Sequence, residues 1–202
     1  MEKLNEQDIL KNVPEKNMYD KDTTSLKWKK DLIDFFKDKN LKSCLEIGTC
    51  KGITTKVLSY LFKEVYTIEN NPSRLNEAKQ FCQERTNIKY ILGDVYSNNT
   101  YLNFPQSFDA VMIDCMHLYP HVIADINRAL TFFDESKGLY LIFDDYGHPE
   151  STGVKKAVDE SIQMGLNIET HIGQTPGFTV NRIDGSSFSI LHREGIILSY
   201  GK

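Results

Sequence analysis

Short apolar runs alternate along this chain with longer segments in which apolar residues recur at helical spacing. The short runs predict strands near 43–47, 64–68, 88–92, 109–113 and 138–143. The longer segments predict helices near 26–39, 53–62, 73–84, 119–132 and 152–164. Strands and helices in regular alternation are typical of a parallel sheet with right-handed crossovers. The pattern therefore predicts an α/β fold in which helices cover both faces of a mostly parallel sheet.

The alternation ends after residue 166, where no segment is long enough for a helical crossover. Three strand-like segments joined by turns follow, namely Asn167–Ile172, Phe188–His192 and Ile196–Tyr200. Strands that are joined by short turns pair antiparallel. We therefore expect a C-terminal antiparallel hairpin on one edge of the sheet.

The N-terminal end is less regular. The first 24 residues are polar and lysine-rich with few apolar anchors, which predicts a loose arm or lid. Ser25 is placed to cap the helix near 26–39, and Trp28 either closes over a ligand or anchors that helix. We therefore divide a single compact domain into an arm and lid helix (1–40) and a ligand-binding part (41–202).

The composition of the chain argues against some classes of binding partner. The chain has 202 residues, with 24 basic against 28 acidic side chains and a net charge of −4. This balance gives no general footprint for nucleic acid or for an anionic membrane, and no apolar stretch approaches the ~20 residues of a membrane span. The four cysteines have no CxxC spacing, so buried thiols in a reducing cytoplasm are expected. A cytoplasmic protein without nucleic-acid or membrane partners is predicted.

The first predicted strand ends in a glycine turn. Gly48 follows the apolar run, and Gly52 precedes the next helix, so backbone can approach a ligand at Gly48 and the helix can start close against the strand. Such a glycine pair alone is common in α/β loops. Glu69, however, lies 21 positions after Gly48 at the end of the next strand. An acid about 20 residues past a glycine turn is where a nucleotide-type ligand has its ribose hydroxyls bound.

Acidic residues also follow the other predicted strands. The series is Glu46, Glu69, Asp94, Asp114, Asp144 and Asp145. One such acid is more often a helix cap or a turn former than a ligand. Because ligands of open α/β sheets bind beyond the carboxyl ends of the strands, the whole series predicts one shared crevice.

The run from Glu46 to Gly52 resembles the first motif of class I S-adenosylmethionine-dependent methyltransferases, and Gly93-Asp94 resembles their segment beside the adenine. The similarity extends from about residue 41 to 164. It implies a Rossmann-like sheet and S-adenosylmethionine as the methyl donor. The donor-binding residues that it implies are Glu46, Gly48, Thr49, Gly52, Glu69, Asn70, Asp94 and Asp114.

The pattern Asp114-x-x-His117-x-Tyr119, with Asp144-Asp145-Tyr146-Gly147 after the fifth strand, looks like the macrocin-type and catechol-type small-molecule O-methyltransferases. The resemblance implies a divalent cation, Mg²⁺ or another, held by Asp114, Asp144 and Asp145. Crowded carboxylates repel one another unless a cation or protons compensate, and an oxygen-rich site suits such a cation. The alternative is that Asp145 only caps a turn and Asp114 only touches the donor.

The resemblance also implies catalytic roles for Asp114 and His117. His117 stands where catechol-type enzymes carry a catalytic lysine, and a histidine there is suited to accept a proton near neutral pH. The alternative is that His117 only orients the substrate through a hydrogen bond. Met116 occupies the position of a second acid in the macrocin-type pattern, which leaves the identity of the base open.

The sequence thus predicts a metal-assisted O-methyltransferase for a hydroxylated small molecule, a sugar or a phenol, with a homodimer as a possible assembly. The alternatives are a metal-independent N- or RNA methyltransferase and a non-catalytic ligand-binding protein that retains the fold. An NAD-dependent oxidoreductase is a third alternative. The spacing Gly-x-x-x-Gly, in place of Gly-x-Gly-x-x-Gly, argues against it.

Overall fold

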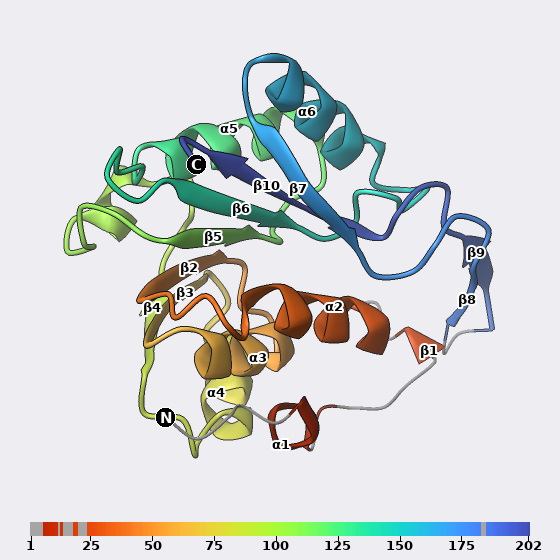
Figure 1. Ribbon diagram of the computed structural model, residues 1–202. Coiled ribbons are helices and arrows are strands. Elements are labelled where there is room, and N and C mark those ends of the chain that lie inside the picture. Colours follow the sequence, from red (N-terminus) through yellow and green to blue (C-terminus); the bar gives the residue numbers. More distant parts are fainter. Residues whose placement is uncertain (1–5, 12, 14–17, 20–23, 183–184) are drawn as a thin grey trace.

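The computed structural model describes residues 6–11, 13, 18–19, 24–182 and 185–202. Its main sheet has seven strands in the order β4-β3-β2-β5-β6-β10-β7 (Figure 1). Their bounds are β2 (Ser43–Ile47), β3 (Glu64–Glu69), β4 (Ile88–Leu92), β5 (Ala110–Ile113), β6 (Leu139–Phe143), β7 (Asn167–Ile172) and β10 (Gly195–Tyr200). The first five are parallel, and β10 runs antiparallel between β6 and β7. The predicted parallel sheet with a C-terminal antiparallel pair is confirmed.

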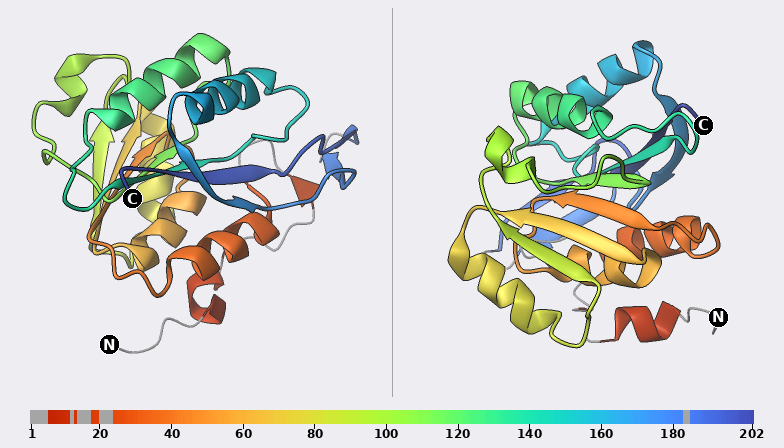
Figure 2. Two further views of the ribbon diagram at one scale, coloured as in Figure 1. Left: turned by 45° about the horizontal axis from the view of Figure 1, so that its top comes forward. Right: turned by 90° about the vertical axis from the view of Figure 1, so that its left-hand side faces the viewer.

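Helices cover both faces of this sheet (Figure 2). One layer contains α1 (Glu6–Leu10), α2 (Leu26–Phe36), α3 (Ile53–Leu61) and α4 (Pro72–Phe81). The other contains α5 (Tyr119–Leu130) and α6 (Thr152–Gln163). Two apolar clusters fill the interior, one between the sheet and α1, α2 and α3, and the other between the sheet and α5 and α6. A short 3₁₀ helix, η1 (Asn98–Tyr101), follows β4.

A small second sheet contains β1 (Met18–Tyr19), β8 (Thr179–Arg182) and β9 (Ser187–Ser189). Strand β8 pairs antiparallel with β9 and parallel with β1. The prediction that residues 188–192 add a strand to the main sheet is therefore wrong, because only Phe188 and Ser189 lie in a strand and that strand belongs to the small sheet. Figure 1 places this sheet beyond the ends of β7 and β10.

The N-terminal segment also differs from the prediction. Residues 6–10, expected to be part of a loose arm, form α1, because Ile9 is fully buried in the cluster beneath the sheet. Residues 1–5, 12, 14–17 and 20–23 of that arm lie outside the described part of the chain. Trp28 is fully buried in the same cluster, so it anchors α2 and does not close over a ligand.

The order of the strands fixes where a ligand can bind. From β2 the chain moves outward to β3 and β4, and then returns to the other side of β2 for β5 and β6. This topological switch point leaves a crevice between the carboxyl ends of β2 and β5. Among the described residues, no helix is long and apolar enough to cross a membrane.

Candidate active site

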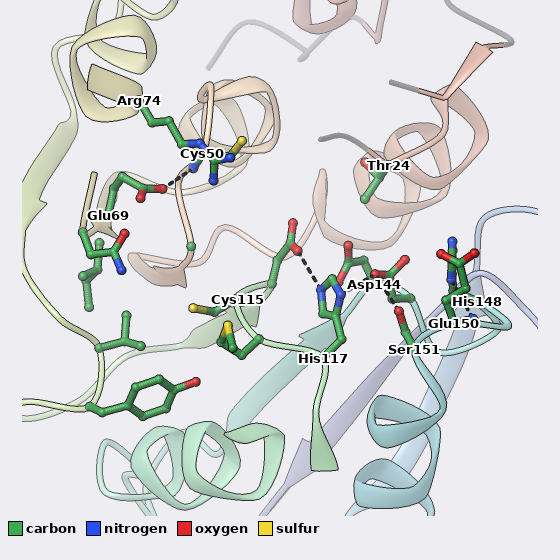
Figure 3. A pocket seen from close by; sticks show the side chains of 18 of the residues that line it. Thr24, Cys50, Glu69, Arg74, Cys115, His117, Asp144, His148, Glu150 and Ser151 are labelled. Carbon is green, nitrogen blue, oxygen red and sulfur yellow. Dashed lines mark hydrogen bonds and ion pairs between the residues drawn. The ribbon is translucent and has the colours of Figure 1, made fainter. Parts of the chain in front are cut away.

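A cavity of about 830 Å³ lies along the carboxyl ends of the parallel strands. This volume is in the range of pockets that hold small molecules and cofactors. Figure 3 shows Glu69 and Cys50 at one end of the cavity and His117, Asp144 and His148 at the other. The predicted site residues that line it are Gly48, Glu69, Asn70, Asp94, Asp114, His117, Asp144 and Asp145. We call the end with Glu69 the donor end and the end with Asp144 the acceptor end.

The glycine turn brings the backbone to the wall of this cavity, which Gly48 lines. Gly48 has a φ of +103°, and a Cβ atom there would lie 1.9 Å from the carbonyl oxygen of Asp114. The amide N–H groups of Gly48 and Thr49 both donate to the carbonyl oxygen of Ile68. The turn is therefore held tightly between β3 and the end of β5, in a position that only glycine can occupy.

Gly52 has a different role from the one predicted. Its φ is +80°, and a Cβ atom there would lie 2.8 Å from the Cβ of Ala78. The close approach that requires glycine is thus between the start of α3 and α4, and not between α3 and the strand. Gly52 does not line the cavity.

Glu69 is fixed at the donor end by two backbone bonds. Its Oε2 accepts a hydrogen bond from Cys50 N at 2.9 Å, and its Oε1 accepts one from Asn71 N at 2.9 Å. The side chain is buried, yet it still lines the cavity. Asp94 lies at the same end, where its Oδ1 accepts from Tyr96 N. A carboxylate oriented in this way is suited to accept hydrogen bonds from vicinal hydroxyls.

Glu46 and Thr49 lie behind the cavity wall and do not line it. Glu46 is buried, and the hydroxyls of Thr55 and Thr67 each donate to its Oε2 at 2.5 Å. The Thr49 hydroxyl is 2.6 Å from that of Thr67. These groups support the glycine turn from below, and their direct contact with a donor stays a prediction.

We expect Glu46 to make stability decrease as the pH rises. Burial raises the pKa of Glu46 to about 8, so the folded protein keeps a proton that the unfolded chain loses above its ordinary carboxyl pKa. The free energy of unfolding should therefore decrease between about pH 4.5 and about pH 8, by up to about 5 kcal/mol, since one pKa unit corresponds to about 1.4 kcal/mol.

Denaturant unfolding of wild type and Glu46→Gln between pH 5 and pH 8 tests this expectation. The side-chain amide of the variant cannot ionise, so its free energy of unfolding should decrease less steeply with pH. Part of the slope should persist, because burial also raises the pKa of Asp125 to about 7. Identical slopes for the two proteins would show that Glu46 is ionised in the folded state.

Three groups at the acceptor end could hold a metal ion. Asp114, His117 and Asp144 each direct one ligand atom into a space in which these atoms lie within 4.8 Å of one another. Asp145 is not in this group. Instead, its Oδ2 lies 3.2 Å from Nδ1 of His117, and its backbone has a φ of +51°. The chain topology thus brings together residues 114, 117 and 144, with Asp145 on the other side of the imidazole ring.

The acceptor end concentrates negative charge. Burial and the neighbouring Asp114 and Asp145 raise the pKa of Asp144 well above its usual value, and burial also raises that of Asp145. Asp114, 3.7 Å from Nε2 of His117, raises the pKa of the histidine. Asp144 is 8% exposed, and the charges that raise its pKa are those of other carboxylates. A buried carboxylate crowded by like charges fits a site that takes a cation.

Glu194 and Phe188 are among the residues of this region that the sequence did not predict as site residues. Glu194 lines the acceptor end and accepts hydrogen bonds from Ser25 N (2.8 Å), Ser25 Oγ (2.5 Å) and Gln174 N (2.8 Å). Phe188 of β9 lines it too, with its ring centroid 4.3 Å from that of His148. Because β10 is antiparallel, its beginning lies at the edge where the parallel strands end. The predicted antiparallel hairpin could therefore have indicated that Glu194, just before β10, lies at the site.

The sequence model of a family described as "Methyltransferase domain" matches residues 45–146, which is half of the chain. The chain belongs to this methyltransferase family. The match begins in β2 and ends just after Asp145, so it includes the glycine turn and the acids of the strand ends. A search of curated proteins gave no match.

Solved structures share the class I methyltransferase fold. An O-methyltransferase from Bacillus cereus, in complex with SAH, has a TM-score of 0.66 and 16% identity, and the alignment covers 96% of this chain and 88% of that one. An O-methyltransferase of tomaymycin synthesis from Streptomyces achromogenes, in complex with SAM, has a TM-score of 0.64, 18% identity and coverages of 88% and 81%.

A fibrillarin from Aeropyrum pernix with bound S-adenosyl-L-methionine is also similar, with a TM-score of 0.53, 17% identity and coverage of 79% of this chain. The chain spans 66% of the fibrillarin's length. At these identities the likenesses establish the fold, and the acceptor must be argued from the site.

Proposed function

We propose that this methyltransferase uses S-adenosylmethionine to methylate a hydroxyl group of a small molecule, with assistance from a divalent cation. The observation that supports this most is that a single cavity joins the fixed carboxylate of Glu69 to the acid cluster of Asp114 and Asp144. A donor bound at one end and a cation bound at the other would therefore lie within reach of each other.

The donor end fits a nucleoside. Glu69 is oriented by two backbone N–H groups and leaves lone pairs for ribose hydroxyls, while Asp94 lies further along the same wall. Several similar structures were determined with SAM or SAH. The glycine turn allows the methionine part of the donor to pass close to the backbone.

Asp114 and Asp144 are the residues that would hold the cation, and Nε2 of His117, which faces the same space, would stay uncoordinated. When bound, a divalent cation lowers the pKa of a coordinated hydroxyl and orients its oxygen. We place Asp145 as the partner that orients His117, because its Oδ2 faces Nδ1 and leaves Nε2 directed at the acid cluster. A carboxylate that orients a histidine in this way favours the histidine as proton acceptor.

In the methyl transfer, the acceptor oxygen attacks the methyl carbon of the sulfonium group in line with the carbon–sulfur bond. That bond breaks, its electron pair returns to sulfur, and S-adenosylhomocysteine leaves uncharged at the sulfur. Nε2 of His117 takes the hydroxyl proton. The cavity contributes chiefly by holding the two reactants in this geometry.

The charge of the acceptor end favours a small molecule over nucleic acid. Asp114, Asp144, Asp145, Glu150 and Glu194 line it. Among the described residues of the cavity wall, Arg74 is the one Arg or Lys side chain, and it lies on α4, which starts just after Glu69. A wall with this sign of charge repels phosphates. We therefore expect an acceptor without negative charge.

A transfer assay with methyl-labelled S-adenosylmethionine tests the proposal. Phenols and sugars would be offered as acceptors with Mg²⁺, and again with a chelator. We expect transfer to a hydroxyl group that the chelator suppresses and Mg²⁺ restores. Transfer that the chelator leaves unchanged would remove the cation from the mechanism. Transfer to nitrogen or to RNA alone would contradict the acceptor class.

A further inference from the structure

A buried lysine lies behind the acceptor end. Lys29 of α2 is 2% exposed, and its Nζ donates to the carbonyl oxygen of Thr24 and, at 2.8 Å, to the Thr24 hydroxyl. Thr24 lines the cavity (Figure 3). The ammonium group is therefore separated from the cavity by a single residue.

The surrounding framework holds this lysine in place. Ser25 caps α2 by accepting from Trp28 N, and its own N–H and hydroxyl both donate to Glu194. Glu194 precedes β10 and lines the cavity next to the acid cluster. The start of α2, which carries Lys29, is thus bound to the same edge of the sheet that carries the carboxylates.

The charges near Lys29 are those of the acceptor end. Burial lowers the pKa of Lys29 to about 8, and the negative charges of Glu194, Asp114 and Asp144 act in the opposite direction. Below that pH the ammonium is protonated, and it therefore offsets part of the negative charge that these three acids produce. A buried charge is retained only when such partners compensate for its lost hydration.

We propose that Lys29 is an internal cation of the acceptor end and that it weakens the binding of a divalent cation there. The inference rests on the proposed function, because the divalent cation is the one assigned there to Asp114 and Asp144. The ammonium attracts the acids and stabilises their cluster when no metal is bound. It also repels a second cation that binds to the same carboxylates. Lys29 thus sets how strongly the site takes its metal.

Titration calorimetry of MnCl₂ at pH 7 into wild type, Lys29→Met and Lys29→Gln tests the proposal. Both substitutions remove the charge, and the glutamine variant keeps a donor for Thr24 if the methionine variant does not fold. We expect both variants to bind Mn²⁺ at least about tenfold more tightly than wild type. Their melting temperatures should be lower in a chelator, and Mn²⁺ should raise them by more than it raises that of wild type.

Lys56→Met is the matched control. Lys56 is equally buried, at 3% exposure, but its Nζ pairs with Glu84 at 2.5 Å and not with residues of the cavity. This variant should lose stability while its Mn²⁺ affinity stays within about twofold of wild type.

The outcomes separate this proposal from the proposed function. Equal or weaker Mn²⁺ binding by both Lys29 variants, with binding by wild type, would overturn the role of Lys29 and leave the metal site. Binding by the variants alone would support Lys29 and show that the wild-type site is kept weak. No binding by any of the proteins would overturn both, whereas metal-independent methyl transfer by wild type would overturn only the mechanism.

Discussion

Gly48→Ala should abolish binding of the methyl donor and destabilise the fold. At a φ of +103° an alanine is strained, and its Cβ would lie 1.9 Å from the Asp114 carbonyl oxygen. Contact with backbone cannot be relieved by a rotamer change, so the glycine turn must move away from the end of β5. We expect a loss of about 3 kcal/mol or more in the free energy of unfolding and at least about 100-fold in donor affinity.

Gly165→Ala is the matched control for this prediction. Gly165 has a similar φ of +112°, but nothing lies within 4 Å of a Cβ placed there. This substitution should cost only the backbone strain, about 1 kcal/mol, and leave donor affinity unchanged. Calorimetry with S-adenosylhomocysteine and urea unfolding measure both quantities. Equal losses in the two variants would show that the turn is not held against β5.

Asp144→Asn should remove activity while making the protein more stable. Asp144 is buried, and its pKa is raised by burial and by neighbouring acids, so its ionised form costs folding free energy. The neutral amide removes that cost. We expect a melting temperature about 5 °C higher in a chelator. The same change removes the deepest cation ligand, and metal-dependent methyl transfer should decrease at least about 100-fold.

Asp125→Asn separates the two effects. Asp125 is also buried, its Oδ2 has no hydrogen-bond partner among the described residues, and burial raises its pKa to about 7. It does not line the cavity. At pH 8 this variant should gain stability as Asp144→Asn does, but keep its activity within about twofold. Full activity in Asp144→Asn would instead remove Asp144 from the reaction.

The parallel half of the fold could be predicted because its strands are buried on both faces. Strands β5 and β6 are continuous apolar runs, and β2 is apolar apart from Ser43 and Glu46; all three are buried along almost their whole length. The ends of the chain give weaker signals. Strand β7 is mostly exposed, and α1 has Ile9 as its one fully buried residue. Apolar character also does not say which sheet a run joins, which is why residues 188–192 were placed in the wrong one.

The candidate site could be predicted as far as the carboxyl ends of parallel strands determine it. Residues next to the strand ends were harder to place. Glu46 lies one residue before the strand end, so it points into the interior instead of the cavity. Asp145 adjoins Asp144 but faces His117, because neighbouring residues point in different directions. No strand rule distinguishes these cases.

Lys29 illustrates a different difficulty. It is spaced with Ile33 and Phe36 on the apolar face of α2, where its spacing alone would have indicated burial. A lysine in a polar, lysine-rich segment is nevertheless usually solvated. Besides its hydrogen bonds to Thr24, the charges that compensate for its burial are those of Glu194, Asp114 and Asp144, which are distant in sequence. Such compensation is visible only once the chain is folded.

A crystal structure with S-adenosylhomocysteine and Mn²⁺, with the metal located by its anomalous scattering, tests the central claim most directly. We expect both ligands in one cavity, with the ribose hydroxyls on Glu69 and the Mn²⁺ ion on Asp114 and Asp144. An Mn²⁺ ion at another surface, or S-adenosylhomocysteine bound away from Glu69, would contradict the convergence of donor and cation on which the proposed chemistry depends.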